Sequence, residues 1–424
     1  MTGATTGTAA GAEHGAAGTD SADAAAGVGG AAAPMGGAGP VGEAGAVGAA
    51  GVPAGTSPRT HGAAGPGEPD RTSVSARPAT AQDAEAASEG LPDLLPDRWR
   101  PGNNRRSFVA ESGGTVLGHC RGIDNDFHPA SRSLVLETVP GFDDDLRCRV
   151  EDALLGAQIA VSTVPLRMKV YASDAAGRAL AARHRAVAIQ ACPPWRYRVG
   201  PELRQWAAAH RHADDAESGA LGAGRGGAAE PDVPCPVRPA DVEELRDLEV
   251  AHYTAQHARW SPAAAPEVLR DELGEAYNGP AGTLGLDVER SVVLRRGGRL
   301  VAAGVVWPSE EHVTGPGAEV SLLSDPAEGP TARADKEACL AAVLDRCQDG
   351  DVLCLDSHLT ERTEIAMMRE VPGLDPAAGD GWMVILDVPV GRERRPWTLP
   401  AALVPDEASW IREFIPGASD SGSS

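Results

Sequence analysis

The sequence predicts an α/β protein with mixed sheets (α+β), built as two tandem modules that follow a disordered N-terminal tail. Three observations support this prediction. The first ninety residues contain no Leu, Ile, Phe, Trp, Tyr or Cys, whereas the remaining residues have the composition of a folded protein. A short motif with a Gly-Gly pair at its centre occurs twice. Segments with strand and helix character then follow each copy in the same order.

Composition divides the chain into five parts. Residues 1–90 are mostly Ala, Gly, Thr, Ser and Pro, which cannot bury enough apolar surface to offset the entropy lost on ordering, so we expect a disordered tail. A polar, Gly/Ala-rich segment at 207–234 predicts a linker. The folded modules are therefore expected at 91–206 and 235–389, with a C-terminal extension and tail at 390–424.

The repeat predicts the same hairpin in both modules. Arg106–Cys120 reads RSFVAESGGTVLGHC, and Arg290–Gly304 reads RSVVLRRGGRLVAAG, with no gap between the two. Each copy has strand-forming residues on both sides of Gly-Gly, which is typical of a β-hairpin.

After each hairpin we expect a strand, a helix, a short strand, a second helix and a last strand. In the first module these elements are expected at 133–139, 143–159, 166–172, 175–184 and 186–191. In the second module they are expected at 318–323, 334–348, 351–357, 360–370 and 382–388. The second module also has opening elements: a short strand from Val237 and helices over 241–256 and 266–277, begun by Asp241 and Pro266. We expect the first module to lack such opening elements.

The order β-α-α-β-β-β-α-β-α-β over 235–389 resembles the GNAT superfamily of N-acetyltransferases. The first module resembles the same fold without its opening elements, as a degenerate copy. The resemblance rests on element order and on the repeat. It implies that the second module transfers an acyl group from acetyl-CoA to a primary amine, in a small molecule or a peptide.

In this family acetyl-CoA lies between the fourth and fifth strands, and its pyrophosphate lies at the turn into the next helix, where free backbone N–H groups attract anions. By element order these positions correspond to 318–323 and Gly329–Glu337. The resemblance therefore implies cofactor contacts at Val320, Leu322, Leu323, Thr331, Arg333 and Ala334.

Two features depart from the family pattern. Asp335 and Glu337 occupy the first turn of the expected helix, where acids stabilise an empty helix by about 0.3–1 kcal/mol each and repel phosphate. The helix expected at 360–370 has no Tyr to protonate the departing thiolate. The alternative function is therefore a non-catalytic GNAT-like binding or scaffold protein that has lost acetyl-CoA chemistry.

Two residues are candidates for catalysis. Glu319, on the expected fourth strand, would accept the proton of the amine; otherwise it is a solvent-facing residue at a strand start. His358, at the end of the expected fifth strand, would act as a base or contact the substrate; otherwise it is a loop histidine. Asp356 is placed to orient His358.

No metal site is expected. The seven cysteines include no C-x-x-C pair, so we expect buried, reduced thiols. His210 and His212 lie at the edge of the expected linker and are more typical of a solvated polar run. The stretch Asp124–His128 lacks the Gly and Glu of a calcium loop and predicts a turn. His252 and His257 are five residues apart, so they do not share a helix face.

The charge indicates which partners to expect. The formal net charge of −22 disfavours nucleic acid and anionic membranes. No run of about 20 apolar residues occurs, and the first residues do not have a secretory pattern. We therefore expect a soluble, cytoplasmic protein. Lys169 and Lys336 are the only lysines, which is typical of a GC-rich, bacterial genome. The oligomeric state is not predicted.

Overall fold

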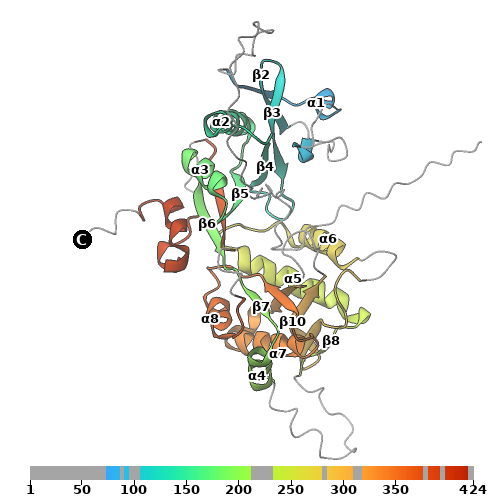
Figure 1. The fold of residues 1–424 in the computed structure, drawn as a ribbon. Helices are drawn as coiled ribbons and strands as arrows, with labels where there is room; N and C mark the ends of the chain where they lie inside the picture. Colours follow the sequence, from blue (N-terminus) through green and yellow to red (C-terminus); the bar gives the residue numbers. More distant parts are fainter. Residues whose placement is uncertain are drawn as a thin grey trace, which may run out of the picture. The chain divides into compact units, whose positions relative to one another are not determined.

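The chain forms two mixed sheets, shown in the computed structural model of Figure 1, which confirms the α/β class. The structure describes residues 73–85, 90–94, 106–211, 233–278, 284–308, 318–375, 381–391 and 397–418. Sheet A has seven strands and sheet B has six.

Sheet A carries the first hairpin and the elements that follow it. Its strands, in spatial order, are β1 (Ser75–Pro78), β2 (Ser107–Ser112), β3 (Thr115–Asp124), β4 (Arg132–Thr138), β5 (Leu166–Tyr171), β13 (Met383–Val388) and β6 (Val187–Cys192). The helices in this part of the chain are α1 (Ala81–Glu85), α2 (Asp144–Val161) and α3 (Ala175–Arg183). Asp143 caps α2 by accepting a hydrogen bond from the backbone N–H of Leu146.

Sheet B carries the second hairpin. Its strands, in spatial order, are β7 (Arg196–Arg198), β12 (Val352–Leu355), β11 (Ala318–Ser324), β10 (Arg299–Trp307), β9 (Val292–Arg296) and β8 (Cys235–Pro236). The helices are α4 (Pro201–Ala209), α5 (Val242–His257), α6 (Pro266–Tyr277), α7 (Ala332–Leu344) and α8 (Arg362–Glu370). From β8 to β13 the elements follow each other in the order that the sequence predicts.

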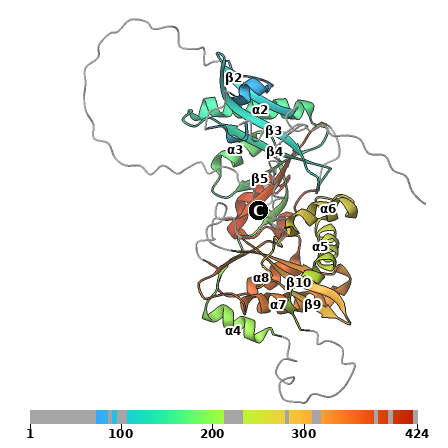
Figure 2. The same cartoon turned by 90° about the vertical axis from the view of Figure 1, so that its right-hand side faces the viewer.

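Two layers of helix cover the strands of sheet B. The side chains of Val320 and Leu322 join the apolar cluster that contains α7, whereas Leu323 joins the cluster that contains α5. This alternation is the period of two that a strand imposes. Helices α5 and α6 contact each other and lie side by side in both ribbon views (Figures 1 and 2).

The prediction of a disordered tail over 1–90 was wrong for its last part, where the chain forms β1 and α1. β1, within 1–90, pairs with β2 as β8 pairs with β9, so the first module also has an opening strand. The strand contains no large apolar residue, but backbone pairing and the Arg77 side chain hold it in place. Arg77 forms ion pairs with Asp83 and Glu111, both at 2.8 Å. The other residues of the predicted tail lie largely outside the described ranges.

Each sheet contains one strand from the other half of the chain. β13, near the end of the second half, lies between β5 and β6 in sheet A, whereas β7, from the first half, pairs with β12 in sheet B. The sequence interpretation ended the two modules with strands at 186–191 and 382–388. The first of these stays in sheet A as β6, whereas the second, β13, joins sheet A instead of sheet B. β6 and β7 are separated by Pro193 and Pro194, which have no N–H to donate to a ladder, so the chain leaves sheet A there and enters sheet B.

A buried ion pair fixes β13 against β5. Arg167 and Asp387 are cross-strand partners. The guanidinium donates two hydrogen bonds to the carboxylate, at 2.9 and 3.1 Å, and Asp387 is only 4% exposed. Beyond β13, the described part of the predicted C-terminal extension is packed rather than free. Leu399 and Ile411 are buried in the same apolar cluster as β13.

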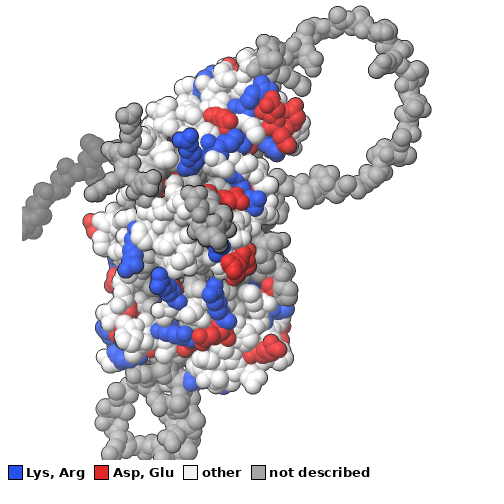
Figure 3. Space-filling view, turned by 90° about the vertical axis from the view of Figure 1, so that its left-hand side faces the viewer, with Lys and Arg blue, Asp and Glu red and all other residues white. Residues whose placement is uncertain are grey.

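The surface combines both signs of charge. On the face drawn in Figure 3, Lys and Arg side chains lie beside Asp and Glu side chains. Arg183, for example, contacts Glu151 at 2.6 Å and Asp152 at 3.0 Å. Within the described ranges, no helix has both the length and the apolar composition of a bilayer-spanning segment.

We expect Asp387→Ala to lower the free energy of unfolding by about 3–5 kcal/mol, because the substitution leaves the Arg167 charge buried and unpaired. Equilibrium urea denaturation measures this difference. The matched control is Asp406→Ala, since Asp406 pairs with Arg412 but its side chain is 97% exposed; we expect a loss of about 0–1 kcal/mol there. Equal losses in the two variants would show that the pair does not hold β13 in place.

Candidate functional site

The parallel strands β11 and β12 separate after a short paired stretch. Their register runs from Ala318↔Leu353 to Val320↔Leu355. β12 then ends, whereas β11 continues to Ser324. The last residues of β11 therefore have strand partners only on the β10 side. The position between the fourth and fifth strands, where the family resemblance implies acetyl-CoA, corresponds to this end of the β11–β12 pairing.

Glu319 lies within the paired stretch, opposite Cys354 and one residue before the last paired residue of β11, Val320. By strand alternation it shares a face with Leu323, on the side covered by α5. Its Oε1 atom is buried and has no hydrogen-bond partner among the described residues. Burial, and secondarily the Asp356 carboxylate, raise the pKa of Glu319 to about 8, although Lys169 acts in the opposite direction.

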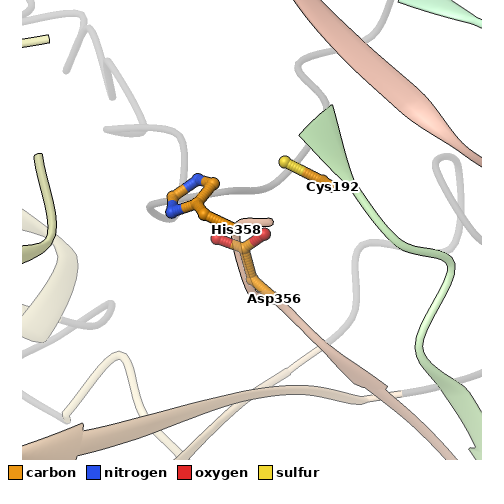
Figure 4. Close-up of side chains that lie close together, drawn as sticks. All are labelled: Cys192, Asp356 and His358. Atoms are coloured by element: carbon orange, nitrogen blue, oxygen red, sulfur yellow. The ribbon is translucent and has the colours of Figure 1, made fainter. Parts of the chain in front are cut away.

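His358 and Asp356 follow β12 and meet the end of β6. The Cys192 sulfur, one Asp356 carboxylate oxygen and one His358 ring nitrogen all lie within 4.8 Å of one another. Figure 4 shows Cys192 at the end of its strand with its sulfur pointing toward the His358 ring. Asp356 is partly buried, whereas His358 is 4% and Cys192 7% exposed. The predicted proximity of Asp356 to His358 is therefore present.

The His358 ring contacts a cluster of aromatic rings from other segments, in edge-to-face geometry. The ring centroids of His257 and Trp260 are 5.2 and 5.0 Å from that of His358. His128 lies 4.8 Å from His257, and its Nε2 is 2.6 Å from the Tyr253 hydroxyl. The Nδ1–H of His257 donates to the Tyr253 carbonyl oxygen at 2.9 Å. The stretch Asp124–His128, expected to be only a turn, therefore places His128 in this aromatic cluster.

The histidines of this region divide by charge. Burial lowers the pKa of His128 to about 4 and lowers the pKa of His257 well below its ordinary value. Burial also opposes the charged form of His358, but the facing Cys192, Asp356 and Glu361 raise its pKa well above the ordinary value. Burial raises the pKa of the Cys192 thiol. His128 and His257 are therefore favoured as neutral imidazoles, whereas the neighbours of His358 favour its charged form.

The predicted phosphate turn is occupied by the protein's own ion pairs. Gly329 adopts a positive φ of 55° just before α7. Arg296 bonds Asp335 at 2.7 Å and Glu328 at 2.5 Å, and Asp335 is only 1% exposed. Arg299 contacts Glu328 as well as Asp325. Carboxylates and arginines thus neutralise one another where a pyrophosphate was expected, so this turn does not fit a phosphate group.

The residues that the family resemblance implies as cofactor contacts differ in burial and in their partners. Val320, Leu322 and Leu323 bury their side chains and pair with β10, and only Leu322 and Leu323 lie beyond the pairing with β12. Thr331 and Ala334 are exposed. The Arg333 guanidinium bonds Glu337 at 2.8 Å and also Glu370.

Sequence reasoning missed Cys192, His257, Trp260 and Glu361. The Glu361 carboxylate accepts hydrogen bonds from the His358 backbone N–H, at 3.1 Å, and from the Gln256 side chain, at 2.7 Å. These residues come from different elements and have no common spacing. The one available signal was Pro193-Pro194, which marks Cys192 as the end of a strand.

No protein-family model matches the sequence, and no curated protein is similar to it in sequence. Among solved structures, a GCN5-related N-acetyltransferase from Sphaerobacter thermophilus is similar in fold, with a TM-score of 0.40 and 14% identity over 78% of this chain and 98% of that one. Eis1 from Mycobacterium abscessus gives a TM-score of 0.36 and 14% identity, with coverages of 74% and 72%. A tandem GNAT protein from the clavulanic acid biosynthesis pathway gives 0.36 and 16%, with coverages of 75% and 100%.

These similarities are distant and concern the fold alone. The chain itself shows two mixed sheets, each covered by helices. Neither a substrate nor the identity of an active module follows from the comparisons.

We expect Glu319→Gln to flatten the pH dependence of stability. Glu319 ionises near 4.5 when unfolded and near 8 when folded. Between these values the unfolded chain has lost a proton that the folded chain keeps, so the free energy of unfolding falls as pH rises from about 4.5 to 8. Because Glu319 keeps some solvent contact, its share of the slope should lie below the one-proton limit of about 1.4 kcal/mol per pH unit.

Urea denaturation of both proteins across this pH range measures the difference in slope. Glu202→Gln, at an exposed position on α4, is the matched control and should keep the original slope. Parallel profiles for the original chain and Glu319→Gln would contradict the raised pKa.

Proposed function

We propose that the chain is an acyl-CoA-dependent N-acyltransferase that acts on a primary amine, with its active site at the divergence of β11 and β12. One observation carries the proposal: the Oε1 atom of Glu319 is buried, has no hydrogen-bond partner among the described residues, and lies one residue before the β11–β12 pairing ends. A carboxylate that lacks a partner and is largely shielded from water favours a cationic ligand. An amine at neutral pH is such a cation.

In the proposed reaction, Glu319 first takes one proton from the substrate ammonium, and the lone pair of the neutral amine then attacks the thioester carbonyl. The C–N bond forms, the C–S bond breaks with its electron pair going to sulfur, and the second nitrogen proton passes through water to the departing thiolate. A base with a pKa of about 8 is suited to deprotonating an ammonium group near neutral pH. The edge of β11 that faces away from β10 has no strand partner after Val320, and it would supply hydrogen-bond groups for the thioester arm.

We assign proton transfer to Glu319 rather than to His358. The His358 ring packs against Trp260 and His257, and its Nδ1 lies 3.5 Å from Glu361. Proton transfer depends first on reach, and Glu319 lies on the diverging strand itself.

A second candidate function is a non-catalytic GNAT-like binding or scaffold protein. The ion pairs at the turn before α7 favour it, because a pyrophosphate there would have to separate Arg296 from the buried Asp335. α8 contains no Tyr to act as an acid. Titration with acetyl-CoA distinguishes the two functions.

We expect calorimetric titration of the full chain to show acetyl-CoA binding, and mass spectrometry to detect acetylated product from a panel of small primary amines and amine-bearing peptides. Glu319→Gln should lower kcat by about 10²–10⁴-fold, since the base is lost. The kcat of the original chain should rise with pH up to about 8, where Glu319 becomes ionised.

Glu202→Gln serves again as the control and should keep the original kcat. Absence of binding at millimolar acetyl-CoA would leave the scaffold function. Binding and turnover that Glu319→Gln does not change would instead refute Glu319 as the base.

A further inference from the structure

Three side chains of different chemistry converge at the junction of the two sheets. Among the residues that the structure describes, one group of His, Cys and carboxylate donors comes together closely enough to share an ion. It consists of Cys192 from the end of β6, and of Asp356 and His358 from the segment after β12 (Figure 4). We propose that this group binds one zinc-type divalent transition-metal ion, independently of any acyl transfer.

The donor set fits such an ion. Thiolate sulfur, imidazole nitrogen and carboxylate oxygen are the ligands that Zn²⁺ takes in proteins, at bond lengths of about 2.0–2.3 Å. Ligand atoms around a tetrahedral zinc ion are roughly 3–4 Å apart. The three atoms here already lie within 4.8 Å of one another, so small side-chain rotations complete the geometry. Magnesium and calcium prefer oxygen ligands only and are disfavoured by the thiol and imidazole.

The surroundings of His358 orient it as a ligand. Its Nδ1 lies 3.5 Å from the Glu361 carboxylate and has no closer partner among the described residues. Gln256 holds that carboxylate with a hydrogen bond of 2.7 Å. Ligating histidines commonly donate their other ring N–H to a carboxylate, which fixes the ring and its tautomer. Glu361 would therefore hold Nδ1 and leave the other ring nitrogen as the metal ligand.

A second use of the same side chains is nucleophilic catalysis by the thiol. In such a relay the acid and the nucleophile lie on opposite sides of the imidazole. Here Asp356 and Cys192 lie within 4.8 Å of each other as well as of one ring nitrogen. A nucleophile must also meet its substrate, and Cys192 is only 7% exposed. Convergence and burial favour ion binding.

Three protein ligands leave a fourth position open, which is typical of zinc sites that hold a water molecule. His257 is the nearest additional imidazole, with its ring centroid 5.2 Å from that of His358. Its Nδ1–H already donates to Tyr253, so only its other nitrogen would be free to face the ion or its water.

The test is metal binding by the full chain, prepared without an affinity tag and dialysed against Zn²⁺. Mass spectrometry of the bound metal should give about one ion per chain. Replacement of zinc by Co²⁺ should produce the near-ultraviolet absorption of a cobalt–thiolate bond. Cys192→Ser should abolish that band, and Glu361→Gln should weaken zinc binding about 10–100-fold by removing the carboxylate that orients His358.

Cys148→Ser is the matched control, because Cys148 is a free, partly buried cysteine on α2, outside the cluster. It should keep both the stoichiometry and the cobalt band. Far-ultraviolet circular dichroism shows whether each variant folds. If Cys192→Ser does not fold, the cobalt–thiolate band and the zinc stoichiometry of the unsubstituted chain still test the proposal. A stoichiometry far below one, or a band that survives in folded Cys192→Ser, would overturn the proposal.

Discussion

The structure depends on the exchange of one strand between its two sheets. β13 lies between β5 and β6, so sheet A is continuous only when a segment from the second half of the chain joins it. β7 extends sheet B from the other direction. All six residues of β13 are buried, and such apolar area stabilises the fold only in that slot. Each half of the chain therefore needs the other, and residues far apart in sequence must pair before either sheet is complete.

The candidate site is a consequence of this exchange. Cys192 is the last residue of β6, and the next strand, β7, pairs with β12. The short link through Pro193 and Pro194 thus sets the distance from Cys192 to the residues that follow β12. The backbone N–H of Leu359 donates to the Ala191 carbonyl oxygen at 3.0 Å, which ties the two segments together beside the cluster. α5 packs against the same cluster through His257, whose ring contacts that of His358.

The sequence predicts the elements well but not their partners. The Gly-Gly turns and the apolar alternation locate both hairpins, because turn chemistry and burial are local properties. They do not determine which sheet receives β13, since an apolar strand buried on both sides fits either one. β1 was missed because Arg77, rather than apolar side chains, holds it. Glu319 was found because element order placed it on the expected fourth strand, whereas Cys192 gained its neighbours only through the exchange.

The turn before α7 constrains how an acyl-CoA would be held. For Arg296 to contact a phosphate, it would have to release Asp335, which is only 1% exposed. Separating a buried carboxylate from its partner costs about 3–5 kcal/mol, which would offset most of the gain from a new arginine–phosphate contact. A CoA thioester would therefore be held mainly through its pantetheine arm along β11, with little contribution from phosphate charge. Binding of this kind depends weakly on salt, in contrast to a turn whose backbone N–H groups face the pyrophosphate directly.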